Sequence, residues 1–181
     1  MSWAKLLGLA ALALCGSCGW HAGLELPPGA RNIGLEYFAN DSLEPDLEAD
    51  LAFELSQFLS SHVDAPLASP EHADVVVRGR VLNFRRRGGA RSRQNELLEA
   101  GVRIDASAEL VRRADGLVLA RSASGVWSSY TTDQVANELD ARQRALQHVA
   151  EALVLDLLSQ ASYEGAAEEA VSAEVLDELL P

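Results

Sequence analysis

The middle of the chain contains three stretches in which apolar and polar residues alternate, a pattern typical of strands with one buried face. The stretch 73–87 places valines on one face and arginines on the other, and the stretch 102–110 is the most regular. Asp115-Gly116 is a strong hairpin signal before the third stretch, 117–130. We therefore predict an antiparallel meander of three strands, with a loop of about ten residues opening at Gly88-Gly89.

Helical spacing occurs on both sides of this meander. Ser42 and Pro45 suit the start of a first helix, which we expect to end near His62, before a loop over 65–73. Its apolar stripe consists of Leu47, Leu51, Leu55, Phe58 and Leu59. Thr131 and Gln134 match a capping box at the head of a second helix, which we expect to end near Ser159. Its stripe consists of Val135, Leu139, Leu146, Val149, Leu153 and Leu157.

A further strand is predicted over 31–38, where Ile33, Leu35 and Tyr37 alternate with other residues. The predicted order is therefore β-α-β-β-β-α. Because a sheet must bury its apolar face, we expect an α+β fold. It would be a two-layer sandwich whose four-stranded, mostly antiparallel sheet is covered on one face by two helices. At 181 residues the chain has room for one domain of ordinary size, which we assign to 31–160.

The N-terminal segment 1–17 has the pattern of a cleaved secretory signal. Lys5 precedes an uncharged apolar run over 6–14, which is shorter than the roughly 20 residues that a membrane-spanning helix needs. Cys15 and Cys18 end this segment, and as a C-x-x-C pair they would suit a redox or metal site. The small residues before Cys18 instead resemble a bacterial lipoprotein cleavage site, which implies lipidation at Cys18 and a membrane anchor.

The residues that follow Cys18 indicate where such an anchor would lie. Gly19 stands where Asp would commonly signal retention in the inner membrane, so the resemblance implies the periplasmic face of the outer membrane. The segment 18–30 is rich in Pro and Gly and is predicted to be a lipidated tether. At the other end, 161–181 is an acidic tail that we expect to be disordered or weakly helical.

Charge is distributed unevenly along a chain whose formal net charge is -12. Eight arginines and only two acids lie between Arg78 and Arg103, so an anionic partner is expected there. Guanidinium groups around the flexible Gly88-Gly89 could bind phosphate or carboxylate. The candidates are Arg85, Arg86, Arg87, Arg91 and Arg93. The alternative is a solvated, arginine-rich loop. Nucleic acid is disfavoured, because a chain this acidic would repel a polyanion elsewhere.

The sequence contains no recognisable catalytic motif. The four histidines are scattered, and neither a nucleophile elbow nor a phosphate-binding glycine loop occurs. We therefore expect a protein that is not an enzyme and has no metal or cofactor. Aromatic residues end the first and last predicted strands, namely Tyr37, Phe38, Trp127 and Tyr130. They suit core packing, or alternatively a patch that faces a lipid or a partner.

Several short motifs together resemble the LPS-assembly lipoprotein family LptE over residues 18–160. They are Cys18-Gly19-Trp20, Tyr37-Phe38-Ala39-Asn40, Glu44-Pro45-Asp46-Leu47-Glu48, Ala73-Asp74-Val75 with Gly79, and Asp115-Gly116. The resemblance implies a lipoprotein that plugs and scaffolds the LptD-like β-barrel of the lipopolysaccharide translocon and assists LPS assembly. The arginines would then contact LPS phosphates. The alternative is a stand-alone anionic-lipid-binding or secretion-accessory envelope lipoprotein.

Overall fold

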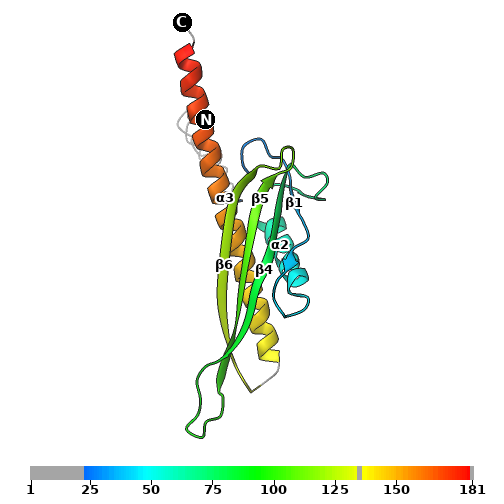
Figure 1. Cartoon of the computed structure of the whole chain (residues 1–181), viewed down its shortest axis with the longest axis vertical. Coiled ribbons are helices and arrows are strands. Elements are labelled where there is room, and N and C mark those ends of the chain that lie inside the picture. The colour runs from blue at the N-terminus through cyan, green and yellow to red at the C-terminus, as the bar shows by residue number, and fades with distance from the viewer. Residues whose placement is uncertain (1–22, 134–135, 180–181) are drawn as a thin grey trace, which may run out of the picture.

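Three long antiparallel strands form the centre of the fold in the computed structural model, which describes residues 23–133 and 136–179 (Figure 1). They are β4 (Val75–Gly88), β5 (Glu99–Arg112) and β6 (Val118–Thr131). The ten-residue loop between β4 and β5 and the turn at Asp115-Gly116 agree with the predicted meander. Gly116 has a φ of 73°, a conformation that few other residues adopt without strain.

The remaining strands differ from the prediction. The sheet has six strands and is mixed, because β1 (Ile33–Leu35) and β2 (Ala39–Asn40) both pair parallel to β4. A second two-residue strand, β3 (Leu67–Ala68), pairs with β1 inside the segment predicted as a loop. The fold is thus α+β as expected, but the four-stranded, mostly antiparallel sheet was wrong in its strand count and in the direction of these pairings.

Phe38 explains why the predicted strand over 31–38 is divided in two. The chain leaves the sheet between β1 and β2, and the side chain of Phe38 becomes completely buried. A methyl group on Gly79 of β4 would lie 2.7 Å from Cε1 of Phe38, so the glycine leaves the space that the ring requires. Tyr37 points the other way and is 81% exposed.

Two helices cover one face of the sheet, as predicted (Figure 1). They are α2 (Leu47–His62) and α3 (Ala136–Leu179). Leu47, Leu51, Leu55 and Leu59 of α2 are all buried. Of the stripe predicted for α3, Leu146, Val149, Leu153 and Leu157 are buried, whereas Leu139 is 63% exposed and Val135 lies outside the described residues. Small residues such as Ala141 and Ala145 allow α3 to approach the sheet closely.

Both helix starts differ from the predicted caps. Asp46 precedes α2 in the left-handed conformation and makes no side-chain cap. Ser42 bonds instead to Asn40 and Glu44 in the preceding loop. Thr131 is still the last residue of β6, and Gln134 lies outside the described residues. Helix α3 also continues to Leu179, past the end expected near Ser159.

The described part of the tether is attached to the domain. The amide of Leu24 donates to the carbonyl of His62 at 2.7 Å, and the amide of Asp64 donates to the carbonyl of Leu24 at 3.0 Å. The predicted signal segment 1–17 and the lipidation site Cys18 lie outside the described residues. Among the helices that the structure describes, none combines the length and apolar character needed to cross a membrane.

Candidate anion-binding face

The face of the sheet opposite the helices is polar and carries six arginines. They are Arg78, Arg80, Arg85 and Arg87 on β4, Arg103 on β5 and Arg121 on β6. In β5 the buried Val102, Ile104 and Ala106 alternate with Arg103 and Asp105, so the charged side chains share one face. We call this polar surface the outer face. It differs from the core face because no helix packs against it (Figure 1).

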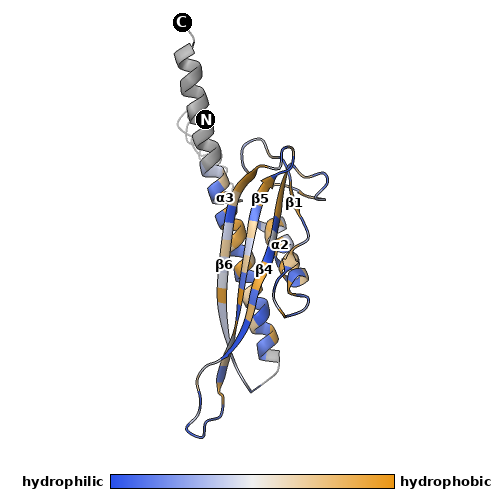
Figure 2. Cartoon of the chain, viewed as in Figure 1, coloured by the Kyte–Doolittle hydropathy of each residue, from blue (hydrophilic) through white to orange (hydrophobic). Residues whose placement is uncertain are grey.

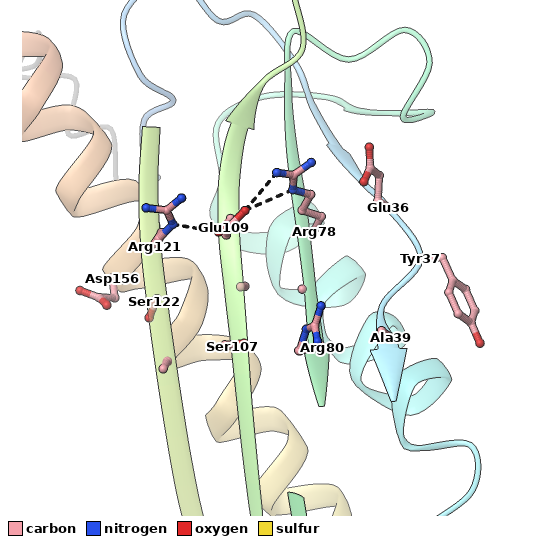
Figure 3. Close-up of a pocket in the computed structure, with 13 residues that line it drawn as sticks. Glu36, Tyr37, Ala39, Arg78, Arg80, Ser107, Glu109, Arg121, Ser122 and Asp156 are labelled. Atoms are coloured by element: carbon pink, nitrogen blue, oxygen red, sulfur yellow. Dashed lines mark hydrogen bonds and ion pairs between the residues drawn. The ribbon is translucent and has the colours of Figure 1, made fainter. Parts of the chain in front are cut away.

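Two groups of three charged residues cross the outer face along neighbouring strands. In the first, Glu109 of β5 lies between Arg78 and Arg121 (Figure 3). Its Oε2 accepts from Nη2 of Arg78 at 3.1 Å, and its Oε1 accepts from Nε of Arg121 at 2.8 Å. Hydrogen bonds from Arg121 and Arg78 lower the pKa of Glu109 below its ordinary value. The three residues together carry one positive charge.

The second group lies nearer the β4–β5 loop. Asp105 accepts from Nη2 of Arg85 at 3.0 Å and from Nε of Arg103 at 2.8 Å. Burial raises the pKa of Asp105, but the two arginines lower it by more, and the net shift is downward. The carboxylate therefore offsets the repulsion of Arg85 and Arg103, which stand directly opposite each other on adjacent strands. One positive charge again remains.

Trp127 and Arg87 extend this second group into a groove. The indole of Trp127 lies over Gly101, where an added methyl group would come 2.2 Å from Cζ2. Arg87 stands opposite Gly101 in the ladder and has no ion pair among the described residues. The groove is lined by Phe84, Arg85, Arg86, Arg87, Arg103 and Trp127. The lining residues include no acid, and Asp105 offsets only one of the positive charges of Arg85 and Arg103, so the groove suits a phosphate group.

Arg86 has a different environment from its neighbours in sequence. It pairs with Val102 in the ladder and reaches toward the helix layer. Its guanidinium donates two hydrogen bonds to the carboxylate of Glu44, at 2.9 and 3.0 Å, and Nε donates to Glu138 at 2.6 Å. The hydrogen bonds to Glu44 and Glu138 raise its pKa above the ordinary value. Arg86 therefore joins β4 to the loop before α2 and to the start of α3.

The other two predicted candidates lie in the exposed β4–β5 loop, which is mainly hydrophilic (Figure 2). Nη1 of Arg91 donates to the backbone carbonyl of Asn95 at 3.0 Å, and Arg93 has no side-chain partner among the described residues. The structure thus brings Arg85 and Arg87 together on the outer face and directs the guanidinium of Arg86 to Glu44 and Glu138. It places Arg91 and Arg93 farther along the hairpin. Sequence analysis did not name Arg103 among the candidate arginines, although the strong alternation around it already indicated its face. It named Trp127 as an aromatic residue of the core or of a partner-facing patch.

The aromatic residues divide between the two predicted roles. Phe38 is buried and Tyr130 packs partly against the core, where its hydroxyl donates to Glu138 at 2.9 Å. Trp127 of β6 is 43% exposed on the outer face, and Tyr37 is exposed at the other edge of the sheet, between β1 and β2. Within residues 23–133 and 136–179, no three His, Cys, Asp or Glu side chains are grouped as metal ligands would be.

Comparison with known proteins identifies related folds. No protein-family model matches the sequence, and no curated protein matches it. Protein XCC0632 from Xanthomonas campestris, of the family DUF330, is 15% identical with a TM-score of 0.53, over 79% of this chain and 95% of that protein. This likeness shows a shared fold. The PelC dodecamer protein from Paraburkholderia phytofirmans is 17% identical with a TM-score of 0.46, over 68% of this chain and 87% of that chain.

Bacterial lipoproteins are among the similar structures. A minor lipoprotein from Acinetobacter baumannii is 16% identical with a TM-score of 0.46, over 71% of this chain and 91% of that chain. None of these three structures is named as an LptE protein or as a component of LPS assembly.

Proposed function

We propose that this chain is an outer-membrane lipoprotein, anchored through Cys18, that plugs and scaffolds an LptD-like translocon barrel and binds lipopolysaccharide phosphates. The proposal rests on the motifs that resemble the LptE family and on the α+β fold that accompanies them. One structural observation supports it most directly, namely the uncovered outer face with its excess of arginines. Such a face can be occupied by an anionic partner without any rearrangement of the core.

The chemistry of the groove favours binding over catalysis. Guanidinium groups stay protonated at any physiological pH and donate hydrogen bonds in a planar fork, so they hold phosphate but transfer no protons. Arg85, Arg87 and Arg103 form the centre of the proposed contact. Arg91 and Arg93 of the loop would extend it, whereas Arg86 is better assigned to holding the domain together.

The position of the groove also fits a lipoprotein that extends away from its anchor. The tether leads into Arg31, whose amide donates to Asp74 at 3.0 Å directly before β4, and the β4–β5 loop lies at the other end of that strand. Arg85 and Arg87 lie about ten to twelve residues along β4 from its start, which corresponds to roughly 35 Å of extended strand. The arginines would therefore contact a partner or ligand far from the anchored end of the domain.

Affinity purification from solubilised outer membrane tests the partner. The full lipoprotein with a C-terminal tag should recover a large β-barrel protein. Recovery of no barrel from membranes that contain the tagged protein would refute the scaffold role.

A double variant separates this function from stand-alone anionic-lipid binding. Arg85→Glu with Arg87→Glu reverses the charge of two arginines on the outer face and leaves Arg86 in place. The matched control is Arg113→Glu, an exposed arginine at the opposite end of the sheet. If the chain scaffolds a barrel, the double variant should still recover the barrel while purified LPS binds it less tightly than the control. A stand-alone lipid binder would lose LPS binding and recover no barrel in any form.

A further inference from the structure

Strand β6 forms an open border of the sheet. It pairs with β5 on one side only, and it runs for 14 residues (Figure 1). The amide of Thr132 donates to the carbonyl of Leu98, the residue before β5, so the even-numbered residue directs its backbone groups toward β5. Because backbone groups alternate in direction along an antiparallel strand, odd-numbered residues of β6 direct their N–H and C=O groups away from β5.

The hydrogen bonds of the described residues agree with this alternation. Nη2 of Arg144 reaches the carbonyl of Ser129, an odd-numbered residue, at 3.2 Å. Elsewhere on the free side of β6, from Arg121 to Trp127, the described residues provide no hydrogen-bond partner. The strand thus carries a row of amide groups that are ready to pair with another strand.

The composition of β6 does not prevent another strand from pairing with this border. Lysines, prolines or inward-pointing charged residues usually prevent exposed edge strands from pairing with the strands of other molecules. The strand has one charged residue, Arg121, and neither lysine nor proline. Most of its middle consists of small residues, Ser122-Ala123-Ser124-Gly125, which allow a second backbone to approach closely.

We propose that a second copy of this chain covers the border, with the two β6 strands antiparallel about a twofold axis at Ser124. Only registers that set odd-numbered residues opposite odd-numbered residues join the free amide groups and keep both outer faces on the same side. Among these, the register centred on Ser124 places Arg121 opposite Trp127 of the partner subunit. The pairing occurs twice and sets a guanidinium, whose Nε is bonded to Glu109 but whose side chain is 71% exposed, beside an indole that is 43% exposed. A cation and an aromatic ring attract each other in this arrangement.

Neighbouring registers lack this complementarity. A shift that centres the axis on Gly125 sets Arg121 opposite Ser129 of the partner subunit, the residue whose carbonyl Arg144 already occupies in each chain. In the favoured register Ala123 stands opposite Gly125 of the partner subunit, and no like charges meet. The dimer would join two outer faces into one continuous sheet surface. This inference does not depend on the proposed function.

Disulfide formation tests the register. In the proposed dimer the two Ser124 residues form a pair without mutual hydrogen bonds, at about 4.5 Å between Cα atoms, which a disulfide can bridge. The full lipoprotein carrying Ser124→Cys should shift to dimer mass on a non-reducing gel after mild oxidation, and return to monomer mass on reduction. Ser60→Cys, on the exposed side of α2, is the control. The unsubstituted protein gives the amount of dimer that forms without an introduced cysteine.

A second variant checks that backbone pairing is responsible. Ala123→Pro removes an amide N–H that points away from β5, so the β5–β6 ladder keeps its bonds. Adding it to Ser124→Cys should abolish the disulfide dimer while the circular dichroism spectrum is unchanged. The proposal is overturned if Ser124→Cys forms no more dimer than Ser60→Cys. It is also overturned if the dimer survives Ala123→Pro in the folded protein.

Discussion

Gly79 lies in the middle of β4, where an alanine is expected to be strongly destabilising. Without steric conflict, replacing a strand glycine by alanine stabilises a protein by about 0.4–1 kcal/mol, because the unfolded chain loses freedom. Here the added methyl group would lie 2.2 Å from the carbonyl oxygen of Ser107, 2.9 Å from Cα of Ala108 and 2.7 Å from Phe38. Two of these three atoms belong to the neighbouring backbone, which cannot move without distorting the β4–β5 ladder.

The free-energy cost of these steric clashes should therefore exceed the stabilisation that comes from the reduced freedom of the unfolded chain. Overpacking a core costs about 1–3 kcal/mol, and the rigid neighbours place Gly79→Ala toward the upper end of that range. A net loss of about 2 kcal/mol would lower the urea midpoint by roughly 1 M, given a slope of about 1–3 kcal/mol/M for small domains. Equilibrium urea unfolding, followed by circular dichroism, measures this shift.

Gly101→Ala is the matched control, since it is the same chemical change in the same sheet but on the outer face. The three atoms nearest the added methyl group all belong to the indole of Trp127, and the closest, Cζ2, would lie at 2.2 Å. That side chain is 43% exposed and can rotate away. We expect stability within about 1 kcal/mol of the unchanged protein, with altered tryptophan fluorescence. A Gly79→Ala variant as stable as the unchanged protein would refute the packing described for Phe38.

Three further changes test the charged contacts and the anchor. Arg86→Ala should lower the free energy of unfolding by about 1–2 kcal/mol because it leaves two carboxylates without their shared partner, and Arg93→Ala should change it by less than about 0.5 kcal/mol. Equal effects in urea unfolding would contradict the role given to Arg86. The pKa of Glu109 is lowered in the folded state, so its contribution to stability is complete above the unfolded pKa of about 4.3 and is lost as the pH falls through the folded value. Glu109→Gln should therefore weaken the acid dependence of the unfolding midpoint, and an unchanged dependence would exclude this ion pair as a source. Cys18→Ser should move the protein from the membrane pellet to the soluble fraction, whereas retention in the pellet would argue against a lipid on this thiol.

The parts of the fold that sequence analysis predicts well are those with a repeated local pattern. The alternation from Val102 to Leu110 identifies β5 and its buried face, and the leucines of α2 repeat at helical spacing and are all buried. Both patterns extend over several residues, so one exception does not hide them. The two-residue strands β2 and β3 have no such repeat. They exist because each pairs with a strand that is distant in sequence, and no local propensity encodes that pairing.

The candidate site was only partly predictable, and a single extra residue in β4 explains why. Val81 and Asn83 pair with consecutive residues of β5, so Leu82 is a bulge and the side-chain alternation of β4 shifts by one after it. Unbroken alternation from Arg78 and Arg80 would place Arg86 on the outer face and turn its neighbours toward the helices. The bulge produces the opposite arrangement of the three arginines. Arg85 and Arg87 join Arg103 on the outer face, while Arg86 reaches Glu44 and Glu138.

This exchange of faces suits both surfaces of the sheet. The helix side at this end has two carboxylates, and one guanidinium with several donors can satisfy both of them. Two inward arginines in its place would be in excess of the acids there, because Arg142 already bonds to Glu44. The bulge therefore turns one arginine toward the helices, where it joins the two layers, and places the other two in the groove beside Trp127. A run of three consecutive arginines thus has two physical roles, and the register of β4 against β5 determines which residue has which.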